Sequence, residues 1–174
     1  MQVTAVGFRF AALKYAHSKD LLSGAGAKIT GGRVNGIGTF PVIYTSTDPQ
    51  TATAETFQNF ADFGFDKNKV RPRVVVGVEI QLAAALDLTE LRIRRRLGVN
   101  LRDLAQPWWP VQEAGHEALT QAIGRAAHDA GFEAIMLPSV RRKGGVNLNV
   151  FPENLHAGSL VKVLAEQDLQ QYLQ

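Results

Sequence analysis

The stretch GGRVNGIGTFPVIYTSTDPQTATAET (residues 31–56) contains a glycine-rich loop, a short apolar run and the beginning of a helix. Three chemically active side chains occur in it eleven residues apart: Arg33, Tyr44 and Glu55. The run PVIYTS (41–46) predicts a strand, because a strand tolerates proline at its first position. The pattern therefore puts a guanidinium on a loop, a phenol on a strand and a carboxylate on a helix, which indicates an anion-binding pocket.

A helix is expected to follow this strand, from about residue 49 to about residue 61. Thr47 or Asp48 is a suitable N-cap, and Pro49 fits the first helical position. Helical spacing puts Glu55 on a different face from the phenylalanines of the same segment. The carboxylate is therefore expected to point away from those aromatic side chains.

The remaining sequence predicts a mixture of strands and helices. Strands are expected at residues 3–10, 73–82, 133–138, 146–151 and 159–164, and helices at residues 89–98 and 112–130. Because strands outnumber helices and the two alternate irregularly, the pattern favours an α+β fold over a doubly wound sheet. With 174 residues, of which 45% are hydrophobic, the chain can form a single domain over residues 1–174 with its own core.

The composition excludes several classes of protein. The chain has no cysteine, which rules out disulfides, thiolate catalysis and cysteine-ligated zinc. It has no run of eighteen apolar residues and no basic N-terminal segment followed by an apolar stretch, so we expect a soluble cytoplasmic protein that does not enter a membrane. The net charge of +3 is compatible with an anionic ligand but does not identify one.

Short motifs for other functions are incomplete. GAGAKIT (24–30) lacks the glycine spacing of both the P-loop and the dinucleotide fingerprint. HEALT (116–120) has threonine where a zinc-binding helix needs its second histidine, and we expect no metal site. Ser139 lacks the glycine-flanked turn that presents the nucleophile of serine hydrolases.

Two groups of residues have structural interpretations that we favour over functional ones. The four arginines of residues 92–96 are expected to form a solvated helix face, since no aromatic residues alternate with them to stack on nucleic-acid bases. Trp108 and Trp109, which lie between prolines, are expected to be packing residues.

With Arg33, Tyr44, Glu55 and Ser139 in this order, the chain resembles the RES-domain family. Members of this family are the toxins of RES/Xre toxin–antitoxin pairs. The resemblance extends over nearly the whole chain. Its segments are FR (8–9), LLSGAGAKITGGRVN (21–35), VIYTS (42–46), AET (54–56), LDL (86–88), GFEAIMLPSVR (131–141) and VNLNVFPEN (146–154). One difference is Val34, where the family usually has tryptophan. This difference leaves the charged residues of the resemblance unchanged. It is expected to affect how the loop is held or how the pocket is closed on its nicotinamide side.

The resemblance implies an ADP-ribosyltransferase-like fold, a mixed β-sheet core with flanking helices, that binds NAD+ and cleaves its nicotinamide–ribose bond. It implies catalytic roles for Glu55, Arg33 and Tyr44, and NAD+ contacts from Arg9, Arg33, Tyr44, Ser139 and, more weakly, Asn147. It also implies an Xre-family antitoxin as the partner that blocks the pocket, and it is compatible with a homodimer. Water, phosphate and a protein side chain all remain open as the acceptor of ADP-ribose.

Elementary chemistry agrees with these implied roles. Two arginines can bind a diphosphate through paired, charge-assisted hydrogen bonds. A carboxylate such as Glu55 can stabilise the positive charge that accumulates on the ribose as nicotinamide leaves, and no metal is required. Tyr44 offers a ring to stack on nicotinamide and a hydroxyl to orient it, while Ser139 can bond the ribose or a phosphate.

Two alternatives remain open from the sequence. A mono-ADP-ribosyltransferase that modifies a protein would use the same NAD+ site and differ only in its acceptor. A noncatalytic nucleic-acid-binding module would use the arginine-rich helix and would not need Glu55. The chain is otherwise expected not to bind DNA.

Overall fold

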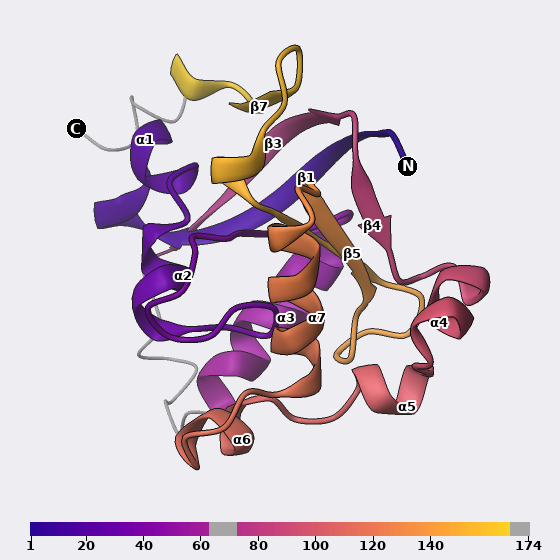
Figure 1. Ribbon diagram of the computed structural model, residues 1–174. Helices are drawn as coiled ribbons and strands as arrows, with labels where there is room; N and C mark the ends of the chain where they lie inside the picture. Colours follow the sequence, from indigo (N-terminus) through magenta and orange to yellow (C-terminus); the bar gives the residue numbers. More distant parts are fainter. Residues whose placement is uncertain (63–72, 168–174) are drawn as a thin grey trace.

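The computed structural model describes residues 1–62 and 73–167, and a single mixed β-sheet organises them (Figure 1). The sheet has seven strands in the order β4-β5-β6-β2-β1-β3-β7, and among its neighbouring pairs only β4 and β5 are parallel. The strands are β1 (Val3–Ala12), β2 (Ile43–Ser46), β3 (Arg73–Leu82), β4 (Ala85–Asp87), β5 (Ala134–Pro138), β6 (Val146–Val150) and β7 (Leu160–Val163). The α+β prediction is confirmed, although the sequence did not predict β4.

The described helices are more numerous than expected, and most of them are short. They are α1 (Ser18–Leu21), α2 (Ala25–Thr30), α3 (Pro49–Asp62), α4 (Leu91–Leu97), α5 (Leu101–Leu104), α6 (Trp109–Glu113) and α7 (Leu119–Asp129), with 3-10 turns η1 (Leu13–Tyr15) and η3 (Pro152–Asn154). Helix α3 packs against β1, β2 and β6, and α7 packs against β5. Gly98 ends α4 in the left-handed conformation, as glycine does at many helix C-termini.

The prediction of one helix over residues 112–130 is wrong. The chain forms α6 and then, after a break, α7. Gly115 lies inside the break with a φ of 78°, and Ala118 is extended as the N-cap of α7. The apolar pattern that suggested continuity belongs to two helices, since side-chain periodicity does not report a backbone reversal.

The core contains clusters of buried side chains from several strands of the sheet. Side chains from β1 and β3 meet side chains from β2, β5 and β6 in one cluster: Val3, Val78, Ile80, Leu82, Ile43, Ala134, Leu148 and Val150. A second cluster joins the glycine-rich loop to α7 and β5, and it includes Val34, Ala127, Ile135 and Leu137. The second cluster fixes the loop that carries Arg33.

Val34 is fully buried in that second cluster, at 0% exposure. Its carbonyl lies against Gly124 of α7, where any Cβ would overlap it. Gln121, also on α7, donates to the carbonyl oxygens of Gly32 and Asn35 at 3.0 and 3.2 Å. Position 34 therefore anchors the loop on α7, and its side chain belongs to the core.

Candidate active site

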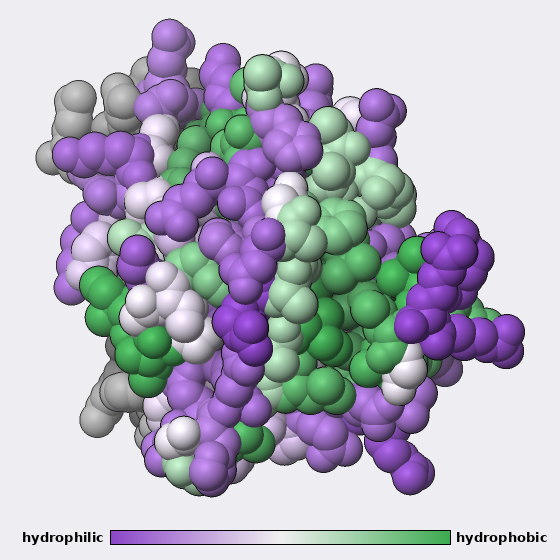
Figure 2. Space-filling view, viewed as in Figure 1, coloured by the Kyte–Doolittle hydropathy of each residue, from purple (hydrophilic) through white to green (hydrophobic). Residues whose placement is uncertain are grey.

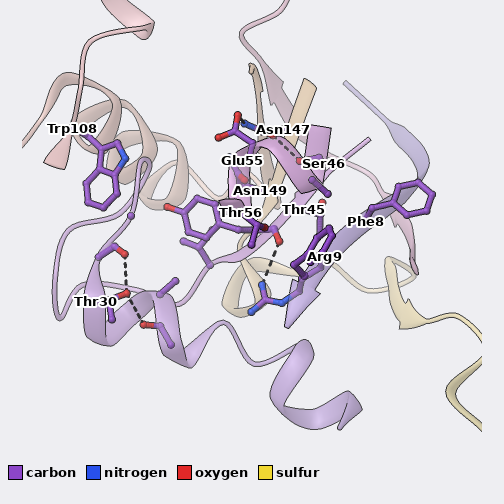
Figure 3. Close-up of a pocket in the computed structure, with 18 of the residues that line it drawn as sticks. Phe8, Arg9, Thr30, Thr45, Ser46, Glu55, Thr56, Trp108, Asn147 and Asn149 are labelled. Carbon is purple, nitrogen blue, oxygen red and sulfur yellow. Dashed lines mark hydrogen bonds between the residues drawn. The ribbon is translucent and has the colours of Figure 1, made fainter. Parts of the chain in front are cut away.

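A pocket of about 760 Å³ opens between α2, α3, the β1–β2–β6 part of the sheet and the start of α6 (Figure 3). This volume is within the usual range for small-molecule sites. Among the residues that line it are Phe8, Arg9, Tyr44, Ser46, Glu55, Trp108, Trp109, Asn147 and Asn149. In Figure 3, Trp108 and Phe8 lie at opposite sides, and Glu55, Ser46, Asn147 and Asn149 lie between them.

Glu55 is the acidic group of this pocket. Ser139 Oγ and Asn147 Nδ2 each donate a 2.7 Å hydrogen bond to Glu55 Oε1. Asn147 is oriented in turn by Ser46, whose Oγ donates to Asn147 Oδ1 at 2.8 Å. Two donors, 84 and 92 positions from Glu55 in the sequence, therefore hold its carboxylate in a fixed direction.

The start of α3 sets the position of Glu55. Asp48 accepts the backbone N–H of Thr51 at 2.8 Å and the Thr51 hydroxyl at 2.6 Å, which identifies it as the N-cap residue. Arg142 Nη1 lies 3.4 Å from Asp48 Oδ1, so the loop that follows β5 is tied to the same helix end. Pro49 is the first residue of α3, as the sequence predicted.

Tyr44 lies on β2 beneath the glycine-rich loop. Its hydroxyl donates to Asn35 Oδ1 at 2.8 Å and accepts the backbone N–H of Val34 at 3.0 Å. Burial raises the pKa of Tyr44 well above its usual value, although the hydrogen bond from Val34 opposes that shift. Gly32 passes so close to the ring that a Cβ there would overlap the hydroxyl. The hydroxyl thus supports the loop, while the side chain also lines the pocket.

Arg9 places a positive charge at the wall of the pocket. It lies on β1 near the point where β1 pairs with β2, and its Nη1 donates to the Tyr44 carbonyl at 3.3 Å. Its Nε is buried and has no partner among the described residues. Burial lowers the pKa of Arg9, although a guanidinium remains protonated at physiological pH.

Arg33 is close to the same site but is directed to backbone carbonyls. Its Nη1 donates to Pro138 O at 3.0 Å, and its Nη2 donates to Leu104 O at 2.8 Å. Burial lowers the pKa of Arg33, and the negative charge of Glu55 opposes this shift. Arg33 thus connects the glycine-rich loop to the end of β5, directly before Ser139, and it is not among the residues that line the pocket.

Ser139 positions Glu55 from the loop after β5. Its Oγ donates to Glu55 and accepts the backbone N–H groups of Arg141 and Arg142, both at 3.1 Å. Of the other five residues predicted from the sequence, Ser139 and Asn147 bond directly to the Glu55 carboxylate. Arg9, Tyr44, Glu55 and Asn147 line the pocket, whereas Arg33 and Ser139 bond to its surroundings.

Two expectations about other residues need correction. Trp108 and Trp109 are only partly buried and line the pocket, so they are not simple packing residues. Their rings meet edge to face, with centroids 5.7 Å apart. Arg94 is buried and donates to the carbonyls of Leu88 and Thr89, so it does not belong to a solvated face.

The other three arginines of α4 fit the expected solvated face. Arg92, Arg95 and Arg96 are exposed, and the surface at α4 is strongly hydrophilic (Figure 2). Side chains of this helix border a separate hollow of about 540 Å³ together with Glu90 and Leu91. This hollow lacks the polar contacts between distant segments that build the Glu55 site.

The sequence analysis missed Asn149 and Ser46 as pocket residues. Both are almost completely buried on strands, at 1% and 3% exposure. The alternation of Asn147 and Asn149 within the apolar strand β6 is a signal that could have found the first of them, because polar side chains are rarely placed inside a buried strand without a partner.

Neither a metal centre nor a membrane span is evident in the part of the chain that the structure describes. Within residues 1–62 and 73–167, no three or more histidine, cysteine, aspartate or glutamate side chains are grouped so that they could hold a metal ion. No helix in these ranges has the length and apolar character needed to cross a bilayer.

A comparison with family models shows which family the chain belongs to. The family model described as the RES domain matches residues 7–171. The Mycobacterium tuberculosis protein named Probable NAD(+) phosphorylase Rv3189 is 40% identical over 121 residues, which are 69% of this chain and 53% of that protein. The chain therefore spans about half the length of this curated relative.

A solved structure shares the fold. A chain in the crystal structure of the M. tuberculosis MbcT–MbcA toxin–antitoxin complex superimposes with a TM-score of 0.75 and 24% sequence identity, covering 98% of this chain and 90% of that one. This similarity extends over almost all of the chain and shows that the two chains share a fold.

Proposed function

Because this chain belongs to the RES-domain family, we propose that it binds NAD+ in the pocket beside Glu55 and cleaves the nicotinamide–ribose bond. The observation that carries the proposal is the orientation of Glu55 by Ser139 and Asn147, both at 2.7 Å, at the wall of a cavity large enough for a nucleotide ligand. A fixed carboxylate lowers the barrier when positive charge develops beside it.

For this reaction the protein needs to supply a carboxylate beside the ribose and a positive charge for the diphosphate. Nicotinamide leaves NAD+ as a neutral molecule, because the electron pair of the breaking bond neutralises its ring nitrogen. The ribose carbon becomes cationic in the transition state, and Glu55 stabilises that charge, by the logic of glycoside cleavage. Arg9, with a buried and unpaired Nε at the pocket, supplies positive charge for the diphosphate.

The roles of the remaining residues follow from their contacts. Tyr44 contributes its ring to the wall of the nicotinamide site, since its hydroxyl is engaged by the loop. Asn147 and Ser139 hold Glu55. Arg33 maintains the geometry of the loop and, because of its charge near Glu55, contributes to binding of the anionic ligand.

Phosphate is the acceptor that we favour, supported by the name of the mycobacterial relative. In this step a phosphate oxygen bonds to the ribose carbon as the carbon–nitrogen bond breaks, and the products are nicotinamide and phosphorylated ADP-ribose. Water gives ADP-ribose by the same cleavage. Transfer to a protein side chain is the third outcome, and the pocket would serve it equally.

The test is nicotinamide release from NAD+ by the purified protein, with and without phosphate. Glu55→Gln should lower the rate by roughly 10²- to 10³-fold, the typical effect of removing a transition-state charge partner. Glu117→Gln is the matched control, since Glu117 is exposed and pairs with Arg125 outside the pocket. Equal rates for wild type and Glu55→Gln would overturn the proposal. A labelled protein band after incubation with labelled NAD+ and lysate would identify a transferase.

We further propose that the protein is a toxin that acts in the cytoplasm and is restrained by an antitoxin, of the Xre family, that covers this pocket. The similarity to a chain of a toxin–antitoxin complex supports this assignment. Expression of the wild type alone should lower cellular NAD+ and stop growth, and expression of Glu55→Gln should not. A purified antitoxin should inhibit nicotinamide release; continued release in its stoichiometric complex would contradict pocket blocking.

A further inference from the structure

Asn149 has a side-chain oxygen without a hydrogen-bond partner among the described residues. It lines the pocket, is 1% exposed, and its Oδ1 is buried with no hydrogen-bond partner among the described residues. A buried acceptor without a partner costs free energy, and such groups in native structures usually have a functional reason. In the same pocket the neighbouring Asn147 is fully engaged with Glu55 and Ser46, so the two asparagines differ in role.

The strand geometry fixes where this acceptor stands. Asn147 and Asn149 are two residues apart on β6, so both side chains point to the same face, about 7 Å apart along the strand. Asn149 pairs with Tyr44 on β2, and Asn147 pairs with Ser46. Cross-strand partners lie side by side on one face. Asn149 is therefore next to Tyr44 and two residues along β6 from Asn147, which holds Glu55.

We propose that the Asn149 side-chain oxygen accepts a hydrogen bond from the carboxamide N–H of the nicotinamide ring, and so selects for the amide. This inference rests on the proposed function, in which Glu55 stands at the ribose carbon that loses nicotinamide. The carboxamide is attached to the nicotinamide ring two positions from the nitrogen that bonds to that ribose carbon. Its separation from the ribose carbon is therefore similar to the spacing of two neighbouring side chains on one face of a strand. The ring itself then lies beside Tyr44, and the substrate amide supplies the donor that Asn149 lacks.

Two NAD+ analogues separate the donor from the rest of the carboxamide. The 3-acetylpyridine analogue keeps the carbonyl and the ring charge but replaces the amide nitrogen with a methyl group. The thionicotinamide analogue keeps the amide nitrogen and replaces the oxygen with sulfur. An acceptor at Asn149 discriminates against the first analogue and tolerates the second. A donor at the same position would give the opposite preference.

The experiment measures kcat/KM of wild type and Asn149→Leu for NAD+ and both analogues. Comparing the two proteins for each substrate cancels the intrinsic reactivity of the leaving groups. We expect Asn149→Leu to lower kcat/KM for NAD+ by about tenfold, a typical value for one hydrogen bond in a buried site. The same substitution should leave kcat/KM for the acetylpyridine analogue nearly unchanged, so that the preference for the amide is lost.

Two further variants keep the test decisive. Asn149→Asp retains an acceptor and should preserve the preference for NAD+ over the acetylpyridine analogue even if its overall activity falls. Gln81→Leu removes a carboxamide from an exposed position on β3, outside the residues that line the pocket, and should change nothing. Should Asn149→Leu not fold, Asn149→Asp alone tests the preference.

The outcomes also separate this inference from the proposed function. Absence of nicotinamide release by the wild type would overturn the proposed function itself. Normal release with equal loss for all three substrates in Asn149→Leu, or with no loss for any, would overturn the role of Asn149 and leave NAD+ cleavage intact. A selective loss for the thionicotinamide analogue would assign the contact to the Asn149 amide nitrogen and contradict the acceptor role.

Discussion

Ser139 Oγ donates a 2.7 Å hydrogen bond to Glu55 Oε1, although the two residues are 84 positions apart in the sequence. The loop after β5 and the helix α3 are also joined by Arg142 and Asp48, 3.4 Å apart. These two contacts fix the loop and the helix relative to each other at the pocket. Ser139 is therefore a positioning residue for the carboxylate.

Ser139→Ala should lower kcat for NAD+ cleavage by about tenfold with little change in KM, because Glu55 loses one of the two donors that orient it. Steady-state kinetics across a range of NAD+ concentrations measure both parameters. Ser139→Thr keeps the hydroxyl and should restore most of kcat. Thr53→Ala, which removes an exposed hydroxyl from the same helix, is the control. A tenfold rise in KM at unchanged kcat would show that Ser139 binds substrate instead.

Val34→Trp should destabilise the protein, although the resemblance drawn from the sequence suggests tryptophan at this position. The side chain at position 34 is fully buried. The backbone of Val34 lies so close to Gly124 of α7 that residue 124 could not carry a Cβ. Overpacking of this kind costs about 1–3 kcal/mol. Urea denaturation should show the loss as a lower midpoint. Ile37→Trp, at an exposed position of the same loop, should have little effect, and a stable Val34→Trp protein would contradict the tight packing.

Arg9→Ala should raise KM for NAD+ by roughly tenfold to a hundredfold, because a guanidinium beside the pocket would otherwise bind the diphosphate. Arg95→Ala removes an exposed arginine from α4 and should leave NAD+ cleavage unchanged. Isothermal titration with NAD+ of both substitutions combined with Glu55→Gln, which slows cleavage, measures binding directly. The noncatalytic nucleic-acid interpretation requires the reverse: loss of function with Arg95→Ala and none with Glu55→Gln.

Glu133 should make the fold sensitive to acid. This carboxylate is fully buried and accepts the backbone N–H groups of Ala84 and His156 at 2.7 and 2.9 Å. Burial by itself raises the pKa of Glu133, but a hydrogen bond from Ser159 and those from the backbone outweigh it and leave the pKa below its usual value.

Because the folded pKa of Glu133 is lowered, the unfolded chain takes up the proton first as the pH falls. The stabilisation is complete above the unfolded value of about 4.3 and is lost as the pH decreases through the lower folded value. Thermal unfolding, followed from neutral pH to a pH below the folded pKa of Glu133, measures this loss of stability. Glu133→Gln should make stability less dependent on pH in this acid range. An unchanged dependence would show that other groups cause the loss of stability.

Local patterns in the sequence determined most of the secondary structure. The strand at residues 73–82 agrees with β3, the helix predicted at residues 49–61 agrees with α3, and Gly98 ends α4 as expected. These features depend on neighbours along the chain: apolar periodicity, a capping side chain and a glycine that adopts a positive φ. The break between α6 and α7 escaped prediction because it depends on a backbone reversal at Gly115 within a pattern that looked continuous.

The sequence by itself predicted most of the polar residues of the candidate site, through the order of Arg33, Tyr44, Glu55 and Ser139 and its resemblance to a family, but it did not predict Asn149 or Ser46. Only the tertiary structure decided the contacts: Arg33 bonds to two carbonyls, the Tyr44 hydroxyl holds the loop, and the buried Asn149 Oδ1 has no partner among the described residues. The physical reason is that hydrogen-bond partners here lie tens of residues apart. Sheet register and packing against α7 bring them together, and neither is encoded in the neighbours of any one residue.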